Sequence, residues 1–373
     1  MALRLVFQTL THFRDIWASL SLLLLLMRFV AGLTEGQQFL NRLGMSPVYD
    51  DIVVPKLGTA FHDVSTIHQL TPKEKNWLSI WRDYASAAYG DVTQGWNCKA
   101  CLKPILDTTE LPVVLKNQDN TCKITLSINR QLQTIVVAFQ GTQNVEGLRV
   151  DVNAFRVDWP SSGSGEKAPN AHFAGAQVHS GFFHSYKSIK LFPTVLDVYL
   201  DRCSDCSLAF VGHSLGGAQA TISMADTLER RPELSPFTAL YTFNAPRVGD
   251  LKFAQAVHDL GPLVIRVVNK KDFITTLPPK SGGFFHVGDE VWIKDDTMSL
   301  YCKTTRDEPE NPRCSLSWPR DTYLPHIRDH SIAWGEPIGE QSWMSWKVFF
   351  SYIWKQVRPV LPGAAKTMMS ASH

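Results

Sequence analysis

The sequence predicts an α/β fold in which crossover helices cover a mostly parallel central sheet. Two observations support this prediction. Between residues 208 and 268, short apolar segments alternate with segments of helical spacing, and strands joined by crossover helices form parallel sheets. The chain of 373 residues is also 44% hydrophobic and 19% charged, which is typical of a globular protein with a large core.

The first half of the predicted domain combines helices with a β-hairpin. A helical pattern runs from Pro72 to Tyr89. Residues Ile124–Asn129 and Gln133–Phe139 alternate or run apolar, so we expect two strands that turn at Asn129-Arg130. Helical spacing returns over Phe182–Tyr199, which predicts a helix there.

The second half contains the strand–helix alternation on which the fold prediction depends. Its strands are short apolar runs, and the first of its helices is rich in Ala, Met and Leu. The expected order is strand Leu208–Val211, helix Leu215–Arg230, strand Ala239–Phe243, helix Leu251–His258 and strand Leu263–Val268.

The charge of the chain does not indicate a nucleic-acid partner. The formal net charge is +2, and the Lys and Arg residues are scattered along the sequence. A nucleic-acid-binding protein needs a concentrated basic face. We therefore expect no nucleic-acid binding.

An apolar segment near the N-terminus predicts a secretory signal peptide. Basic residues precede the apolar run Ile16–Met27, which is short for a membrane span. Val30-Ala31-Gly32 then supplies small residues at which a signal peptidase can cut. We expect a signal peptide over residues 1–32 and secretion of the rest. A signal anchor that stays in the membrane is the alternative, because Arg28 is an unusual neighbour of a cleavage site.

The remainder of the chain is expected to form one domain, residues 33–340, and an extension, residues 341–373. Aromatic and aliphatic residues of the extension follow helical spacing from Trp343 to Val357. Such a helix either lies on a lipid surface or docks on the domain.

Seven cysteines favour a compartment in which disulfides form. Cys98/Cys101 and Cys203/Cys206 have CxxC spacing. Paired CxxC motifs can also bind zinc, but these two pairs lie far apart in the sequence, so we favour disulfides. Because the number of cysteines is odd, one stays unpaired, and we expect it to be Cys122.

The segment Gly212-His213-Ser214-Leu215-Gly216 has the pattern of a nucleophile elbow. The G-x-S-x-G pattern is weak alone, but here an apolar strand precedes it and a helix follows at once. This context presents the serine hydroxyl above the sheet. It also directs the N–H of Leu215 and the positive end of the helix towards the reacting oxygen. An ordinary glycine-rich turn with a buried serine is the alternative.

A serine nucleophile needs a histidine to take its proton and a carboxylate to orient that histidine. After an elbow of this kind, the expected chain order is Ser, Asp or Glu, then His. Asp272 follows the last predicted strand, and His330 lies in a later loop. Spacing favours this pair only modestly. The competing residues are the histidines His286 and His326 and the acids Asp250 and Asp289, of which Asp250 is also explained as a helix N-cap.

Several segments follow, in order, those of one known family. They extend from about Tyr84 to Gly335. The matching segments are Ile135–Thr142, Val178–Phe182, Val211–Gly217, Asn244–Asp250, Arg266–Pro279, Phe284–Trp292 and Asp329-His330. On these segments the chain resembles the class 3 lipases, the fungal-type triacylglycerol lipases. The resemblance implies an α/β-hydrolase fold and hydrolysis of carboxylic esters.

The resemblance also implies the roles of individual residues. It places Ser214 at the nucleophile, Asp272 at the acid and His330 at the base, whereas His286 matches a histidine that is not the base. Thr142 matches the residue whose N–H forms the oxyanion hole with the N–H of Leu215.

Two disulfides are likewise implied by the resemblance. Cys98–Cys101 and Cys302–Cys314 match disulfides of the family. Cys203 and Cys206 have no family counterpart on which to base a pairing.

The segment after Thr142 matches the lid of the family. One face of the expected lid helix is apolar and consists of Val145, Leu148, Val152, Phe155 and Trp159. An amphipathic lid covers the site in water and turns its apolar face to lipid. The alternative is a surface helix packed permanently on the domain.

The sequence as a whole predicts a secreted lipase that hydrolyses acylglycerols through an acyl-enzyme, without a metal or cofactor. A feruloyl esterase or a phospholipase A1 on the same scaffold is one alternative, and a catalytically silent lipid-binding module is another. The apolar lid face favours lipid substrates, and the complete triad favours catalysis. We expect action at a lipid–water interface, with peripheral membrane contact through the lid or the C-terminal helix.

Overall fold

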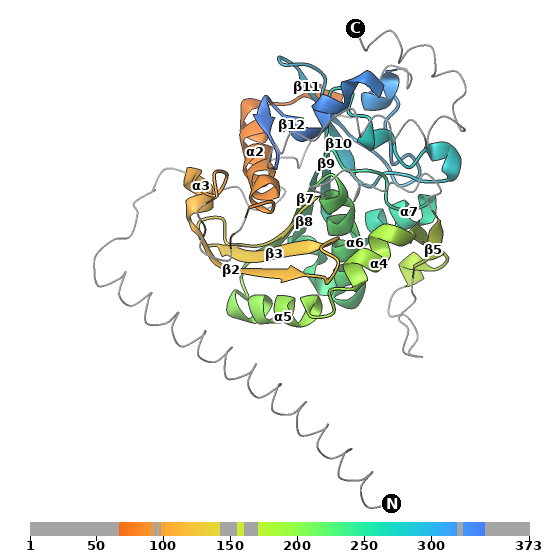
Figure 1. Ribbon diagram of the computed structural model, residues 1–373. Coiled ribbons are helices and arrows are strands. Elements are labelled where there is room, and N and C mark those ends of the chain that lie inside the picture. The colour runs from red at the N-terminus through yellow and green to blue at the C-terminus, as the bar shows by residue number, and fades with distance from the viewer. Residues whose placement is uncertain are drawn as a thin grey trace, which may run out of the picture. The chain divides into compact units, whose positions relative to one another are not determined.

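The computed structural model describes residues 67–90, 92, 96, 98–141, 155–159, 171–318 and 324–339 (Figure 1). The expected signal peptide, residues 1–32, and the aromatic extension, residues 341–373, lie outside these residues. Among the described residues, no helix is both long enough and apolar enough to cross a membrane.

A nine-stranded sheet forms the centre of the fold. The central pairs β4–β7, β7–β8, β8–β9 and β9–β10 are parallel, whereas the pairs on both flanks are antiparallel. The order across the sheet is β1 (Ile67–Gln69), β11 (Ser299–Cys302), β10 (Asp289–Ile293), β9 (Leu263–Asn269), β8 (Thr238–Phe243), β7 (Ser207–His213), β4 (Thr134–Phe139), β3 (Lys123–Asn129) and β2 (Thr109–Lys116).

The predicted α/β fold is confirmed, and the parallel part of the sheet is its central part. Each strand predicted from the sequence is present, with bounds that differ by at most two residues. The helices are α2 (Pro72–Ala87), α3 (Pro104–Asp107), α4 (Ser180–Lys187), α5 (Phe192–Arg202), α6 (Leu215–Arg230) and α7 (Leu251–Leu260). Short 3-10 segments are η1 (Ala171–Phe173), η2 (Pro232–Phe237), η3 (Ile274–Thr276), η4 (Lys280–Gly282), η5 (Ser315–Ser317) and η7 (Leu324–Ser331).

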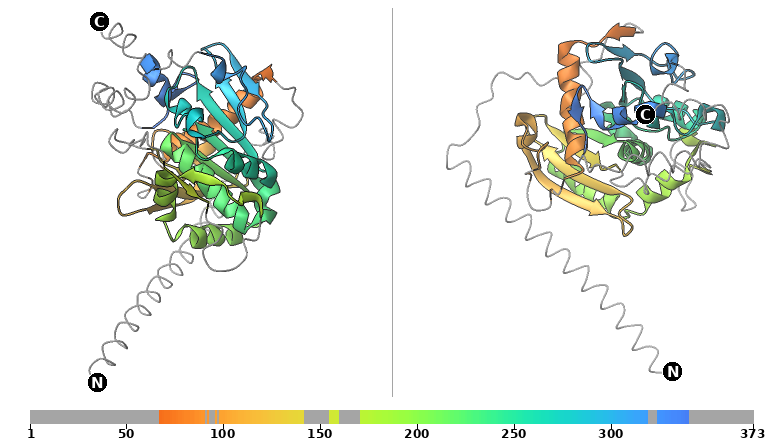
Figure 2. Two further views of the ribbon diagram at one scale, coloured as in Figure 1. Left: turned by 90° about the vertical axis from the view of Figure 1, so that its right-hand side faces the viewer. Right: turned by 45° about the horizontal axis from the view of Figure 1, so that its top comes forward.

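Helices cover both faces of the sheet (Figure 2). Because side chains alternate along a strand, Phe210 of β7 packs in one apolar core with α4–α7, and Val211 packs in the other with α2. In the second core, Trp81 of α2 stacks on Tyr241 of β8 with ring centroids 4.7 Å apart. The strand that leads to Ser214, β7, therefore lies between two buried apolar layers.

The helix predicted over Phe182–Tyr199 is two helices, so this prediction was wrong in one respect. The first, α4, ends at Lys187, and α5 begins at Phe192 with Pro193 in its first turn. Proline has no backbone N–H and its ring clashes with the carbonyl of the preceding turn, so it begins a helix rather than continuing one.

The predicted lid face is wrong at its C-terminal end. Phe155 and Trp159 flank the strand β5 (Arg156–Asp158), which pairs with β6 (Gln177–His179), so they do not share a helical face. The side chain of Phe155 is 71% exposed, whereas Trp159 is buried and its indole N–H donates to Glu229 at 2.8 Å. Tertiary packing of the indole in the core overrides the helical spacing. The other expected lid residues, Val145, Leu148 and Val152, lie outside the described residues.

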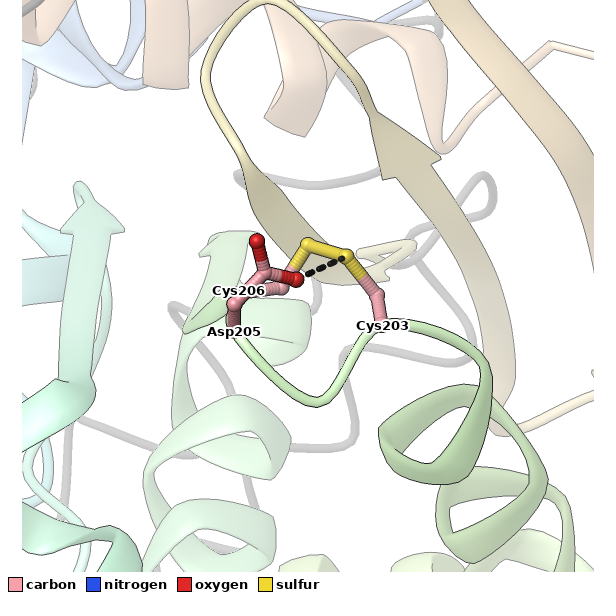
Figure 3. Close-up of side chains that lie close together, drawn as sticks. All are labelled: Cys203, Asp205 and Cys206. Carbon is pink, nitrogen blue, oxygen red and sulfur yellow. Dashed lines mark hydrogen bonds between the residues drawn. A yellow bond between two sulfur atoms is a disulfide. The ribbon is translucent and has the colours of Figure 1, made fainter.

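Three disulfides are present, and Cys122 is free and buried, as predicted. Cys98–Cys101 and Cys302–Cys314 are the two pairs implied by the resemblance. Cys203–Cys206 closes the turn between α5 and β7, with a carboxylate oxygen of Asp205 beside it (Figure 3). Zinc binds cysteine as the thiolate, so the disulfides leave neither CxxC pair available as a zinc site.

A small antiparallel pair, β12 (Ile332–Ala333) and β13 (Glu336–Pro337), completes the described fold. Ala333 and Ile338 pack in the same apolar core as α2. This short pair follows His330 directly, so it ends the loop that carries the expected base.

Candidate active site

Ser214 occupies a sharp turn between β7 and α6. Its backbone has φ 56° and ψ −131°, a strained conformation of the kind that concentrates at functional sites. The N–H of Ser214 donates to the carbonyl of Phe243 on β8 at 2.9 Å, and its side chain does not cap α6. The hydroxyl is therefore free to face the C-terminal edge of the sheet.

The two glycines of the motif are required by close backbone approach. A Cβ atom on Gly212 would lie 2.3 Å from the carbonyl oxygen of Gly216, and one on Gly216 would lie 2.4 Å from the carbonyl oxygen of Phe139. Contacts below 3 Å to backbone atoms cannot be relieved by a side-chain rotation, so the turn around Ser214 requires glycine at both positions.

Ser214, His330 and Asp272 form a continuous hydrogen-bonded chain. His330 Nε2 is 2.8 Å from Ser214 Oγ, and His330 Nδ1 is 2.8 Å from Asp272 Oδ2. Ser214 follows β7, Asp272 follows β9, and His330 lies in η7. The structure thus brings together three residues that are distant in the sequence and that sequence analysis singled out.

The partners of His330 define its protonation. An ionised carboxylate only accepts hydrogen bonds, so Asp272 requires the proton of the neutral imidazole to be on Nδ1. This leaves the lone pair of Nε2 to accept from the Ser214 hydroxyl. Asp272 is fully buried, and its second oxygen accepts from the N–H of Ile274 at 2.9 Å. The lone pair of Nε2 is therefore directed towards the serine hydroxyl, which is the orientation that a general base requires.

A buried ion pair contacts the loop that follows Asp272. Both side chains of the Arg247–Glu310 pair are 1% exposed, and the guanidinium contacts the carboxylate through two N–H groups at 2.9 and 2.8 Å. Arg247 also donates to the carbonyls of Thr276 and Pro278. Burial alone would raise the pKa of Glu310, but hydrogen bonds and the charge of Arg247 lower it well below its ordinary value. The pair therefore stays ionised.

His213 lies beside the site and remains neutral. Its Nε2 is 2.7 Å from the carbonyl oxygen of His330, and its Nδ1 is 2.7 Å from the Tyr89 hydroxyl. Because a carbonyl only accepts, Nε2 carries the proton and the Tyr89 hydroxyl donates to Nδ1. Burial, followed by the neighbouring His330, lowers the pKa of His213 to about 3. The sequence patterns did not predict a role for His213 or Tyr89.

The competing acids and bases have other partners. Asp250 caps α7 by accepting from the N–H of Phe253 at 2.9 Å, as the N-cap explanation predicts. Asp289 accepts from the N–H of Thr304 at 2.7 Å. The competing histidines also have partners other than Ser214.

His286 is buried, and its Nε2 lies 2.8 Å from the carbonyl of Thr275. Burial lowers its pKa well below the ordinary value, and the nearby arginines lower it further. His326 is exposed and its Nδ1 lies 3.7 Å from Asp329. Neither histidine is hydrogen-bonded to Ser214.

Leu215 presents a backbone N–H at the start of α6. As the first residue of the helix it has no intrahelical acceptor for that N–H. The backbone N–H of Gly141 packs 2.9 Å from the position that a Cβ on Gly216 would take. The chain that leads to Thr142 therefore passes against the turn, although Thr142 itself lies outside the described residues.

Comparisons with known proteins agree with this geometry. The family model for lipase (class 3) matches residues 136–282. A lipase of Rhizopus niveus is 32% identical over 236 residues, which are 62% of this chain and 56% of that protein. A lipase of Rhizomucor miehei is 31% identical over 279 residues, which are 72% of each chain. A secreted mono- and diacylglycerol lipase of Penicillium cyclopium is 25% identical over 64% of this chain and 77% of its own length.

The chain is also similar to solved lipase structures. Lipase II of Rhizopus niveus has a TM-score of 0.64 at 27% identity and covers 73% of this chain and 98% of its own. A triacylglycerol lipase whose catalytic centre is a serine-protease triad has a TM-score of 0.63 at 27% identity, with the same coverage. From the Rhizomucor relative, which matches over most of both chains, we conclude that this chain belongs to the class 3 lipase family.

Proposed function

We propose that the protein is a serine carboxylic ester hydrolase that acts on lipid esters of the acylglycerol class. The observation that carries the proposal is the hydrogen-bonded chain Ser214–His330–Asp272, with 2.8 Å at each link. The names of the relatives, which are lipases and a mono- and diacylglycerol lipase, support the substrate class.

In the first half of the proposed reaction, Ser214 becomes acylated. Its hydroxyl gives its proton to His330 Nε2 as Oγ attacks the ester carbonyl. Asp272 stabilises the imidazolium that forms, and the neutral state of His213 avoids a second positive charge beside it. His330 then gives the proton to the leaving alcohol. The product is an acyl-enzyme on Ser214 and a released glyceride or glycerol.

In the second half, water completes the reaction. His330 takes a proton from the water as it attacks the acyl carbonyl, and then returns a proton to Ser214 Oγ as the fatty acid leaves. In both halves negative charge develops on the carbonyl oxygen. We assign its stabilisation to the N–H groups of Leu215 and Thr142. Removing one such donor typically costs about 10²–10³ in rate.

The proposal extends to the place of action. The apolar expected lid residues Val145, Leu148 and Val152 support action at a lipid–water interface, with peripheral contact through the lid or the C-terminal extension. Three disulfides support an oxidising compartment. Together with the expected signal peptide and the secreted Penicillium relative, they support secretion; retention of residues 1–32 as a membrane anchor is the alternative.

The mechanism is tested by Ser214→Ala. We expect kcat for ester hydrolysis to fall by about 10⁴-fold or more, because the nucleophile is lost. The matched control is Ser204→Ala, an exposed serine that precedes β7 as Ser214 follows it. Labelling by a fluorophosphonate probe is expected in the wild type and the control and absent in Ser214→Ala. A Ser214→Ala protein that keeps most of its activity would contradict the mechanism.

The substrate class is tested with a series of glycerides of increasing acyl length, assayed below and above their solubility limits. We expect long-chain glycerides to be hydrolysed and the rate to rise above the limit. A preference for feruloyl or acetyl esters, or for phospholipids, would replace the acylglycerol proposal by a feruloyl esterase or a phospholipase A1. Absence of hydrolysis and of probe labelling in the wild type would favour a silent lipid-binding module.

A further inference from the structure

Side chains at the ends of three adjacent parallel strands hold the backbone of His330. His213 ends β7, Asn244 follows β8, and Asn269 ends β9. The carbonyl oxygen of His330 accepts from His213 Nε2 and from Asn244 Nδ2, both at 2.7 Å. The carbonyl oxygen of Asp329 accepts from Asn269 Nδ2 at 2.9 Å and from Asn244 Nδ2 at 3.2 Å.

Asn244 is the central member of this group. It is 1% exposed. Its amide nitrogen also lies 3.3 Å from the carbonyl of Ile332, and its amide oxygen accepts from the N–H of Asn269 at 2.8 Å. One side chain therefore contacts the backbone on both sides of His330 and ties it to β9, the strand that leads to Asp272.

The backbone of Asn244 indicates that the side chain is what this position requires. Its φ is 52°, in the left-handed region that glycine adopts without strain. Asparagine tolerates this region, but glycine would fit the turn at lower cost. An asparagine here therefore strains the backbone slightly and supplies hydrogen bonds that glycine cannot make.

The segment that carries His330 needs such support. It consists of 3-10 turns with a kink at His326, and no strand of the central sheet contains it. A displacement of the His330 carbonyl moves its imidazole, which must meet Ser214 and Asp272 at the same time. Misplacement of a reacting group by about 1 Å can cost about 10²-fold in rate.

We propose that Asn244 is a positioning residue for His330: its amide holds the Asp329 and His330 carbonyls so that the imidazole stays between Ser214 and Asp272. This inference rests on the proposed function. Because His213 and Asn269 hold the same two carbonyls, loss of Asn244 reduces catalysis without abolishing it.

The test is Asn244→Gly, which removes the amide and relaxes the backbone. Active-site titration with a fluorophosphonate counts the folded sites, and kcat is then expressed per titrated serine. We expect this kcat to fall by about 10- to 100-fold, with KM unchanged, because Asn244 contacts the base rather than the substrate. A purely structural role would lower the number of titrated sites but not the kcat of each site.

The matched control is Asn120→Gly. Asn120 has the same φ of 52° but is exposed and lies in the turn between β2 and β3. Asn120→Gly makes the same chemical change with the same backbone relaxation but lies outside the group that holds His330. The kcat per site of this variant is therefore expected to equal that of the wild type. A comparable fall in both variants would overturn the proposal.

A second variant, Asn244→Asp, keeps the oxygen that accepts from Asn269 and replaces the donor by an acceptor. We expect a fall in kcat per site at least as large as in Asn244→Gly. If either variant folds and keeps kcat per site within about twofold of the wild type, Asn244 has no positioning role. An active wild type with unchanged variants overturns this role alone, whereas a wild type without labelling or hydrolysis overturns the proposed function and this role with it.

Discussion

Ser214 Oγ lies 2.8 Å from His330 Nε2, but the turn that carries Ser214 and the loop that carries His330 are positioned by different kinds of contact. Ser214 is placed by its neighbours in the sequence: β7 precedes it, α6 follows it, and Gly212 and Gly216 allow the backbone to close. His330 is placed by side chains from strands that lie far from it in the sequence. A local motif can therefore define the proposed nucleophile, whereas the position of the proposed base depends on the assembled sheet.

The difference has a consequence for mutational sensitivity. Around Ser214, the critical changes are those that add atoms, because the backbone has no room for a Cβ at Gly212 or Gly216. Around His330 and Asp272, the critical changes are those that remove hydrogen bonds. Three substitutions test this dependence on distant side chains, and their expected effects decrease from Asp272→Asn through Arg247→Met to His213→Gln.

The largest effect is expected for Asp272→Asn. The amide NH₂ cannot accept the Nδ1 proton of His330 and favours the tautomer that carries its proton on Nε2. That tautomer cannot take the proton of Ser214, so we expect kcat to fall by about 10⁴-fold, as the same change does in serine proteases. The control is Asp307→Asn, whose carboxylate side chain is 80% exposed. A fall in kcat of less than tenfold in Asp272→Asn would show that His330 does not depend on Asp272 for its orientation.

A smaller but clear effect on stability is expected for Arg247→Met. The change leaves Glu310 buried without its partner and removes two hydrogen bonds to the loop after Asp272. Breaking one side of a buried ion pair typically costs about 3–5 kcal/mol in the free energy of unfolding. Denaturant unfolding measures the loss.

The matched control for this variant is Arg306→Met, which breaks the exposed pair with Asp259. Solvent screens such an exposed pair, so its loss is expected to change the free energy of unfolding little. Adding Glu310→Met to Arg247→Met is expected to recover part of the stability, since no unpaired charge then remains buried. Equal losses for Arg247→Met and Arg306→Met would show that the buried pair does not support the loop.

The smallest effect, about 1.4 kcal/mol for each pH unit, is expected in the pH dependence of stability, through His213. Its pKa in the folded state is lowered to about 3, whereas an unfolded histidine titrates near about 6.5. The unfolded chain therefore binds one more proton between these values. The stabilisation is fully present above about pH 6.5 and is lost as the pH falls towards about 3, at about 1.4 kcal/mol per pH unit.

His213→Gln removes this titration and can still donate to the His330 carbonyl. We expect its unfolding free energy to fall less steeply with acid than that of the wild type, by about 1.4 kcal/mol per pH unit between about pH 6 and about pH 4. Other acid-sensitive groups are common to both proteins and cancel in the difference. Identical slopes would mean that His213 already carries its second proton in the folded protein between about pH 6 and about pH 4.

The sequence predicted the structure correctly where local patterns decide it. Alternating apolar strands and helices predicted the parallel centre of the sheet, and the strand–turn–helix context predicted the turn at Ser214. The prediction from the sequence was wrong where tertiary packing overrides periodicity. Trp159 has helical spacing relative to the expected lid residues, but its indole is buried against Phe173 and donates to Glu229. Pro193 divides a segment of continuous helical spacing.

The roles of His213, Asn244 and Asn269 were missed for a related reason. A signal was present, since each residue is polar and stands at the C-terminal end of a predicted parallel strand, where the edge residues of a sheet converge. The sequence does not say which distant backbone these side chains contact. For the same reason, spacing alone favoured Asp272 and His330 only modestly over the competing acids and histidines.

The sequence by itself determined the α/β fold, the serine turn and the residue types of the triad, because these depend on periodicity, glycine and the local order of strand and helix. Only the tertiary structure decided that His330 accepts from Ser214, that Asp272 orients it, and that His213, Asn244 and Asn269 hold its backbone. These contacts join residues 58 or more positions apart, and the closest pair in the sequence is Asp272 and His330. Their geometry exists only after the parallel strands have brought their carboxyl ends to one edge of the sheet.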